Sequence, residues 1–224
     1  MSTRKTVRPV ASSSNKLSAK ASEARAPVEA IRAAAFKQFA ERGYPVVTVR
    51  DIMKACGLTQ GALYNHFKSK DELLHDIIAS TQAELERQFQ QAVAGAGADP
   101  RAKLAAFIRV YVLRHCRLRV EALVANREIG WLDADRVADI RRSRRAIREI
   151  LVGILNDGVE KGVFDPPQVD GKRDLKAQAM ALLDQCTHIS MWYGPGGRMS
   201  EEQMAKLYAE TALRSVGARV QDQS

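Results

Sequence analysis

The sequence of 224 residues predicts an all-α fold. It is rich in alanine, leucine and arginine, which favour helices, and only 6% of its residues are aromatic. Apolar residues recur at helical spacing through most of the chain, and no stretch alternates apolar and polar residues with a period of two. The expected helices cover residues 27–42, 48–56, 59–67, 69 to a break at 95–100, 100–118, 120–130, 133–161, 173–193 and 200–217.

Local signals predict where the N-terminal helices begin and end. Pro27 is tolerated in a first helical turn, and Gly43 ends the apolar stripe that follows it. Thr48 and Ser69 each stand three residues before an acidic residue, which is the spacing of a capping box. Gly57 supplies the left-handed conformation that a tight turn between two short helices needs.

The C-terminal two thirds of the chain contain comparable signals. Asp99 followed by Pro100 is typical of a helix start, and Asp133 and Ser200 are expected N-caps. Glycine-containing stops are expected at Gly162, Gly194-Pro195-Gly196-Gly197 and Gly217.

The net charge of +9 lies entirely in the first third of the chain. Residues 1–70 contain 13 lysines and arginines but only four acidic residues, whereas residues 71–224 contain 22 of each kind. Solubility alone does not require this segregation. It indicates a polyanionic partner for the N-terminal part, with nucleic acid as the first interpretation and a membrane surface as the second.

Residues 1–25 are expected to form a disordered tail. They are rich in serine, contain six basic residues and lack periodic apolar residues, so they cannot bury enough surface to offset their ordering entropy. The tail is either a basic arm that adds DNA contacts or plain solvated chain. We expect the folded domains to span residues 26–80 and 81–220.

Several classes of protein are excluded or disfavoured. No apolar run approaches the roughly 18 residues of a spanning helix, and no apolar segment typical of a secretory signal follows the basic N-terminus. The three cysteines are too few for a disulfide framework, which favours a reducing cytoplasm. The sequence contains no H-E-x-x-H motif, phosphate-binding glycine loop or nucleophile elbow.

The segment 48–67 is the strongest functional signal. A helix as short as 59–67 is unstable alone in water, so its apolar side must pack on the helices before it. Its outward residues are then polar or small: Thr59, Gln60, Gly61, Tyr64, Asn65 and His66. Gln60 and Asn65 are suited to adenine edges, and Thr59 and Tyr64 to a phosphate or a thymine methyl group. Thr48 and Lys70 are expected to hold phosphates near helix starts.

These residues form a pattern that closely resembles the TetR family of transcriptional regulators. The resemblance covers about residues 27–80 and lies in Ile31-x-x-Ala34-Ala35-x-x-x-Phe39-x-x-x-Gly43-Tyr44, Thr48-x-x-x-Ile52 and Ala55-x-Gly57-Leu58-Thr59-x-Gly61-x-Leu63-Tyr64-x-His66-Phe67-x-Ser69-Lys70-x-x-Leu73-Leu74. It implies a three-helix helix-turn-helix domain whose third helix enters the major groove of a palindromic operator. It also implies a larger helical ligand-binding and dimerisation domain. By position, the residues that touch DNA are Thr48, Thr59, Gln60, Gly61, Tyr64, His66 and Lys70.

By analogy with the family, the helices at 173–193 and 200–217 form a homodimer interface, although their apolar residues would also suit an internal core. The run Trp192-Tyr193-x-Pro195-x-Gly197-x-x-Ser200-x-Glu202 is similar to a subgroup of which some members respond to acyl-CoA thioesters. In that subgroup an arginine often precedes the tryptophan, where this chain has Met191. Trp192 is therefore a candidate ligand contact or an ordinary core or interface aromatic.

The candidate ligand pocket is drawn from apolar and polar residues of several expected helices. Its members are Phe107, Tyr111, His115, Leu123, Asn126, Ile147, Leu151, Leu183, Thr187 and Trp192. Arg141, Arg145 and Arg148 share one helix face, either as a solvated face or as a phosphate clamp for coenzyme A. Cys116, Cys186 and their neighbouring histidines are expected to be inert rather than a metal or redox site, so no metal or cofactor is expected.

The leading hypothesis is a homodimeric repressor in the cytoplasm, at the nucleoid, that leaves its operator when it binds a small hydrophobic effector such as an acyl-CoA. One alternative is a sequence-blind architectural protein, which would bind random and operator duplex alike. The other is a helical enzyme, which the missing catalytic motifs disfavour.

Overall fold

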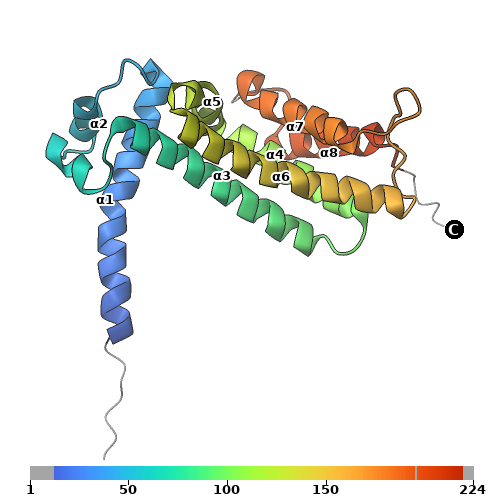
Figure 1. Ribbon diagram of the computed structural model, residues 1–224, viewed down its shortest axis with the longest axis horizontal. Coiled ribbons are helices and arrows are strands. Elements are labelled where there is room, and N and C mark those ends of the chain that lie inside the picture. Colours follow the sequence, from blue (N-terminus) through green and yellow to red (C-terminus); the bar gives the residue numbers. More distant parts are fainter. Residues whose placement is uncertain (1–12, 195, 219–224) are drawn as a thin grey trace, which may run out of the picture. The chain divides into compact units, whose positions relative to one another are not determined.

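The computed structural model describes residues 13–194 and 196–218, and the elements it assigns there are helical (Figure 1). This confirms the predicted all-α fold class. An isolated pair of backbone hydrogen bonds joins Val169 and Lys172 in a tight turn. The helices are α1 (Ser13–Arg42), α2 (Val49–Ala55), the 3₁₀ helix η1 (Gln60–Asn65), α3 (Lys70–Gly95), α4 (Pro100–Arg117), α5 (Arg119–Arg127), the 3₁₀ helix η2 (Glu128–Trp131), α6 (Ala134–Glu160), α7 (Leu175–Trp192) and α8 (Glu201–Ser215).

The chain divides into two compact units, residues 1–70 and 71–224. The division falls at the start of α3, whereas the sequence placed the domain boundary after residue 80. The difference arises because almost all of α3 is counted with the helices that follow it. Its residues Leu85 and Phe89 belong to the hydrophobic core of the second unit.

The start of α1 differs from the sequence-based prediction. The helix begins at Ser13, whereas a disordered tail was expected up to residue 25 and a helix only from Pro27. Residues 16–26 are rich in alanine, lysine and other good helix formers, and Pro27 removes one backbone hydrogen bond without ending the helix. The part of the predicted tail before Ser13 lies outside the described residues.

Four of the predicted helix caps, at Thr48, Asp99, Asp133 and Ser200, are present. The Thr48 hydroxyl accepts from the backbone N–H of Asp51, whose carboxylate accepts from the Thr48 N–H in return. Ser200 forms a second capping box, with Gln203, at the start of α8, and the carboxylates of Asp99 and Asp133 each accept from a backbone N–H in the first turn of α4 and α6. Each cap satisfies a backbone donor that the first helical turn leaves without a partner.

Helix α4 organises the core of the second unit. It packs against α5, α6, α7 and α8, and its Leu104, Phe107 and Val112 are fully buried. The Phe107 ring stacks on Phe89 of α3, with ring centroids 4.0 Å apart. The second unit is therefore a helical bundle built around α4.

The end of α6 is closed by a tight glycine–aromatic contact. A Cβ atom on Gly158 would lie 2.0 Å from Cδ2 of Phe164, a side chain that is only 3% exposed. Gly153, one and a half turns earlier in the same helix, has open space at the same position. The chain can fold back after α6 because Gly158 has no side chain.

Gly158→Ala is expected to lower the free energy of unfolding by about 2 kcal/mol, since the buried Phe164 ring must shift. Gly153→Ala is expected to raise it by about 1 kcal/mol, because alanine is the better helix former. Urea or thermal denaturation followed by circular dichroism measures both. A shift in the same direction for the two variants would contradict this packing.

Candidate nucleic-acid interface and ligand pocket

The core of the first unit fixes the position of η1. Ile31, Phe39 and Ile52 of α1 and α2 are buried, together with Leu63 and Phe67 at and just after η1. The backbone N–H groups of His66 and Phe67 both donate to the carbonyl oxygen of Leu63. Burial of Leu63 and Phe67 leaves the other side of η1 in solvent.

The turn between α2 and η1 is equally well defined. Gly57 has φ +68°, in the left-handed region, and the Leu58 N–H donates to the Met53 carbonyl at 2.9 Å. The Cys56 thiol lies 3.5 Å from the carbonyl oxygen of Ala30 in α1. The sequence-based prediction of a glycine turn at this position is confirmed.

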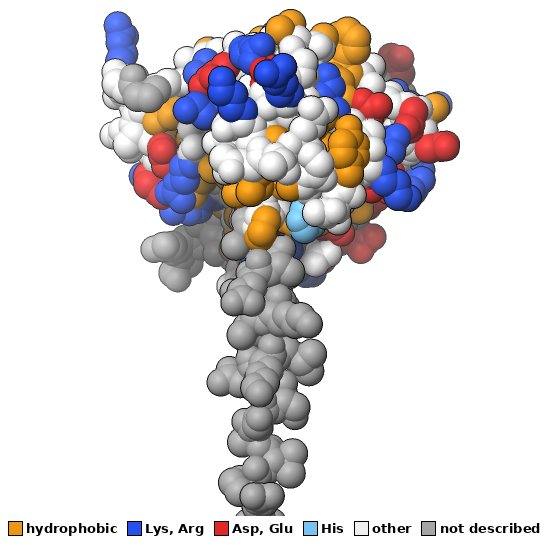
Figure 2. Space-filling model, turned by 90° about the vertical axis from the view of Figure 1, so that its left-hand side faces the viewer, with side chains coloured by type: hydrophobic (Ala, Val, Ile, Leu, Met, Phe, Trp, Pro, Cys, Tyr) orange, Lys and Arg blue, Asp and Glu red, His pale blue; other side chains and the backbone are white. Residues whose placement is uncertain are grey.

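The side chains predicted to contact DNA lie mostly on the exposed side of this unit. The exposed members of the set are Thr48, Thr59, Gln60, Gly61, Tyr64, Asn65 and His66. Tyr64 is 56% exposed although it is a large aromatic residue. The face of the molecule in Figure 2 carries Lys and Arg side chains together with uncharged, hydrophobic and acidic ones. An exposed tyrosine among polar residues and cations suits contact with a nucleic acid.

Thr48 has a second function in the structure. Its hydroxyl donates to the Asp51 carboxylate at 2.8 Å, and its backbone N–H donates to the same group at 3.0 Å. These two bonds, with help from nearby Arg42, hold the pKa of Asp51 below its usual value. Asp51 therefore stays ionised, and Thr48 is fixed in an exposed position at the start of α2.

Lys70 has contacts within the protein that the sequence did not predict. The sequence assigned it to a phosphate of the DNA, but its Nζ donates to the carbonyl oxygens of Tyr44 and Val47, both at 2.9 Å. The same ammonium group lies 4.1 Å from the centroid of the Tyr44 ring. Lys70 thus ties the first turn of α3 to the loop between α1 and α2. It stabilises the loop that precedes α2 and so helps to position the candidate nucleic-acid interface.

The sequence-based prediction did not include Arg50 and Lys54. Both are exposed on α2, one turn apart, in the helix that precedes the turn to η1. The signal was available, because two basic residues at a spacing of four fall on one helix face opposite the buried Ile52 and Met53. They are further candidates for contacts with DNA phosphates.

The second unit contains a cavity of about 230 Å³ between α3, α4, α5, α6 and α7. Six of the ten predicted pocket residues line it: Tyr111, His115, Asn126, Ile147, Leu183 and Thr187. The sequence did not predict the contributions of α3, which are Thr81, Gln82 and Leu85. These three share one helix face, but nothing in the sequence distinguishes a pocket-lining face from a packed one.

The other four predicted pocket residues do not line the cavity. Phe107 and Leu151 are fully buried in the hydrophobic core, where close packing leaves no space for a ligand. Leu123 is half-buried and lies outside the lining set. Trp192 is 59% exposed at the end of α7. This exposure fits the interface alternative of the sequence-based prediction better than a core position.

The cavity takes in only one of the three arginines of the predicted phosphate clamp. Of Arg141, Arg145 and Arg148, only Arg148 lines the cavity, and the other two are exposed. Arg144 and Arg114 line it instead. The inward side of α6 contains the buried Ile140 and Ile147. Arg144 lies on the same side of the helix, so it faces the cavity in place of its neighbour Arg145.

Hydrogen bonds fix several polar groups of the cavity. The Tyr111 and Thr187 hydroxyl oxygens lie 3.0 Å apart and link α4 to α7. His115 Nδ1 lies 2.8 Å from the Tyr111 carbonyl oxygen, which can only accept, so Nδ1 carries the proton. Burial lowers the pKa of His115 to about 4, so the ring is neutral at pH 7 and Nε2 is an acceptor.

Comparisons with known proteins agree with this architecture. The family model described as bacterial regulatory proteins, tetR family, matches residues 31–77. The model described as Tetracyclin repressor-like, C-terminal domain, matches residues 97–216, which is more than half of the chain. The chain belongs to the TetR family. It is a DNA-binding transcriptional regulator with a helix-turn-helix domain and a larger C-terminal helical domain, as the sequence predicted.

Individual TetR relatives cover most of the chain. The HTH-type transcriptional repressor KstR2 of Rhodococcus jostii is 30% identical over 176 residues, 78% of this chain and 83% of that protein. A solved tetR-family regulatory protein from Rhodococcus has a TM-score of 0.74 at 28% identity and covers 86% of this chain and 98% of its own. AibR, solved in complex with isovaleryl coenzyme A and operator DNA, has the same fold with a TM-score of 0.73 at 23% identity, covering 86% and 99%.

Two further findings concern only residues 13–194 and 196–218. This part of the chain has no cluster of three His, Cys, Asp or Glu side chains arranged to hold a metal ion. None of its helices combines the length and the apolar character that a membrane crossing requires.

Lys70→Met is expected to lower the free energy of unfolding by about 1–2 kcal/mol, because two backbone carbonyls lose a charged donor. Lys54→Met removes an exposed charge and should change stability by less than about 0.5 kcal/mol. Thermal denaturation of both variants gives the comparison. Unchanged stability of Lys70→Met, combined with weaker DNA binding, would restore its assignment as a phosphate contact.

Proposed function

We propose that this TetR-family protein is a homodimeric repressor that leaves a palindromic operator when a small molecule binds in its second unit. The DNA-binding part comprises residues 26–80, and the effector and dimerisation part residues 81–220. The proposal is carried by one observation: η1 presents a fixed polar face while a cavity lies within the other unit. It places the protein at the chromosome, in the cytoplasm, and assigns it no catalytic activity.

The proposed contacts with base edges come from η1. Gln60 and Asn65 lie on its exposed side and have the amide groups that pair with adenine. Thr59, Gly61, Tyr64 and His66 complete the same surface, with Arg50 and Lys54 of α2 beside it. Base contacts supply specificity, and the basic residues supply salt-dependent affinity.

The proposed dimer interface is the outer face of α7 and α8. These two helices expose Met191, Trp192 and Leu207, which are 64%, 59% and 44% exposed. Large apolar side chains left in solvent favour burial against a partner. A palindromic operator requires a two-fold symmetric protein, so a second copy of the chain is the natural partner.

We propose an acyl-CoA thioester or another hydrophobic acid as the effector class. AibR, which shares the fold, provides a precedent for isovaleryl coenzyme A and operator DNA on this architecture. The cavity of this chain combines apolar residues with arginines, which suits an acyl group joined to anionic groups. A release of about 100-fold requires the effector to prefer the DNA-free state by roughly 2.7 kcal/mol.

Gln60→Ala is expected to weaken binding to the operator about 10-fold, through the loss of one base-edge contact, with little change in affinity for random duplex. The matched control is Gln90→Ala, an exposed glutamine on α3 whose amide is bonded to Glu86. Fluorescence anisotropy on DNA from upstream of the gene and its neighbours measures both. Equal loss on operator and random duplex would support a sequence-blind DNA-binding protein instead.

Leu207→Glu is expected to shift the protein from dimer to monomer at micromolar concentration, because it places charge in an apolar interface. Operator affinity should fall at least 10-fold with it, since each half-site would then be bound separately. Sedimentation velocity gives the oligomeric state. Ala94→Glu, exposed on α3, is the control. A fully dimeric Leu207→Glu protein would exclude this face as the interface.

A further inference from the structure

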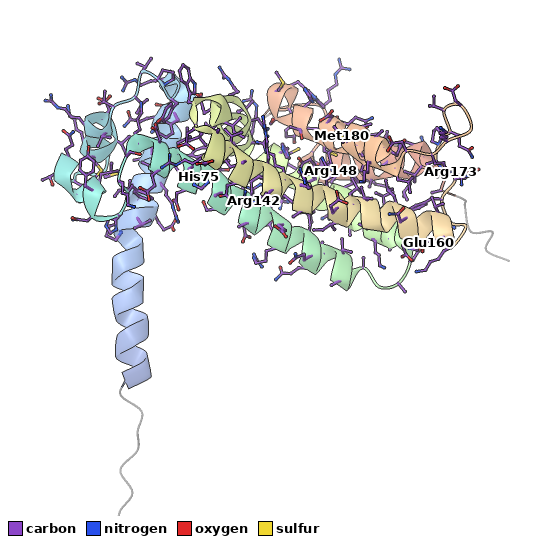
Figure 3. All side chains as sticks on the ribbon, viewed as in Figure 1. His75, Arg142, Arg148, Glu160, Arg173 and Met180 are labelled. Carbon is purple, nitrogen blue, oxygen red and sulfur yellow. The ribbon has the colours of Figure 1, made fainter. Side chains whose placement is uncertain are left out.

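Three arginines from two helices line the cavity of the second unit. Arg114 comes from α4, and Arg144 and Arg148 from α6. Figure 3 labels Arg148 on α6 and Met180 on α7, and both residues belong to the cavity lining. Guanidinium groups remain charged in proteins. Three positive charges therefore face one small space.

Two of these arginines have carboxylates nearby, Arg148 through Glu149 and Arg114 through Glu121 and Glu84, and Arg144 is held by neutral acceptors only. Arg144 Nη2 donates to two neutral acceptors, the Ala125 carbonyl and Asn126 Oδ1, at 3.0 and 3.1 Å. Arg148 Nη2 lies 3.6 Å from the exposed Glu149 carboxylate. Within the described part of the chain, the buried Nε of Arg148 has no hydrogen-bond partner. A buried donor without a partner is costly, so Arg148 is not stabilised in its place by this nitrogen.

Burial makes the charge excess costly. Desolvation lowers the pKa of both Arg114 and Arg144, which shows that their charged forms are less well solvated than in water. Glu121 attracts Arg114, but burial raises the pKa of Glu121 itself. Asp184 is the carboxylate in the lining, and it is exposed. An anion inside the cavity would offset the desolvation of the arginines.

The remaining lining indicates the size and nature of the rest of the ligand. Leu85, Ala122, Ile147 and Leu183 supply apolar surface. A volume of about 230 Å³ is smaller than the 300–1,000 Å³ typical of sites that enclose a drug-sized ligand. The cavity can therefore enclose an anionic group with a short apolar body, and a longer molecule would extend into solvent.

We infer that this cavity is an anion-binding effector site. A carboxylate or phosphate group of a small organic molecule lies among the guanidinium groups of Arg114, Arg144 and Arg148. Its apolar body contacts Leu85, Ile147 and Leu183. The inference deepens the proposed function. Anion binding itself does not depend on that function, but its consequence, release from the operator, does.

The test uses the full-length protein and a panel of short carboxylates, from butyrate to octanoate with benzoate. Each is compared with its CoA thioester and its neutral amide in isothermal titration calorimetry at constant ionic strength. At least one anionic member should bind 10-fold or more tightly than its amide. Binding of free carboxylates identifies a carboxylate as the recognised group, and binding of thioesters alone identifies the coenzyme A phosphates. Either result supports the site.

Arg148→Met and Arg141→Met are the matched variants, since both arginines lie on α6 and only Arg148 lines the cavity. Arg148→Met should weaken binding of the anion at least 10-fold and leave binding of the amide unchanged. Arg148→Lys, which keeps the charge, should restore part of the difference in affinity between the anion and the amide. Arg141→Met should bind as the parent protein does. The ligand-free Arg148→Met protein should melt no lower than the parent, because it loses a buried donor without a partner.

Two results would overturn the inference. One is a panel in which no anion binds more tightly than its amide, and the other is unchanged anion binding by Arg148→Met. Operator binding is measured in parallel to separate the two proposals. A protein that binds operator and discriminates no anions retains the proposed function and loses this site. A protein that binds anions through Arg148 but binds no upstream DNA retains this site and loses the proposed function.

Discussion

Burial of Leu63 and Phe67 is the constraint on which the proposed DNA-binding surface depends. Six residues of 3₁₀ helix cannot hold their own conformation in water, so η1 exists only because these two side chains enter the core of the first unit. The turn at Gly57 and the capped start of α2 then set its direction. Exposure of Gln60 and Tyr64 is a consequence of this anchoring. A polar surface on a freely moving segment would bind DNA with a larger entropic cost.

Features fixed by local chemistry could be predicted from the sequence. Caps at Thr48, Asp133 and Ser200 depend on side chains within three residues, and the structure contains all of them. The start of α1 could not be predicted in this way. Helix formers before Pro27 compete with the loss of one hydrogen bond at the proline, and composition alone does not decide between them. The position of Lys70 also escaped prediction, because its acceptors are more than 20 residues away in the sequence.

The arginine cluster of α6 shows how a small error of helical phase changes a site. Arg141, Arg145 and Arg148 share a face, but so do Arg144 and Arg148, and five arginines in eight residues leave both choices open. The decisive signal was the apolar stripe: Ile140, Ile147 and Leu151 are buried, and Arg144 falls between them at helical spacing. A charged residue within a buried stripe is costly unless something compensates it. Such a residue therefore points to a ligand site more strongly than a run of exposed charges.

Helix α3 connects the two parts of the proposed mechanism within one continuous element. Lys70, in its first turn, holds the loop that precedes α2, and Gln82 and Leu85 line the cavity some three to four turns later. At 1.5 Å per residue, about 18 Å of helix separates Lys70 from Gln82. The backbone hydrogen bonds of α3 run without interruption between these two points. An anion drawn between α4 and α6 by their arginines would act at the cavity end of this helix. Transmission of effector binding then requires no contact between the ligand and the DNA-binding surface.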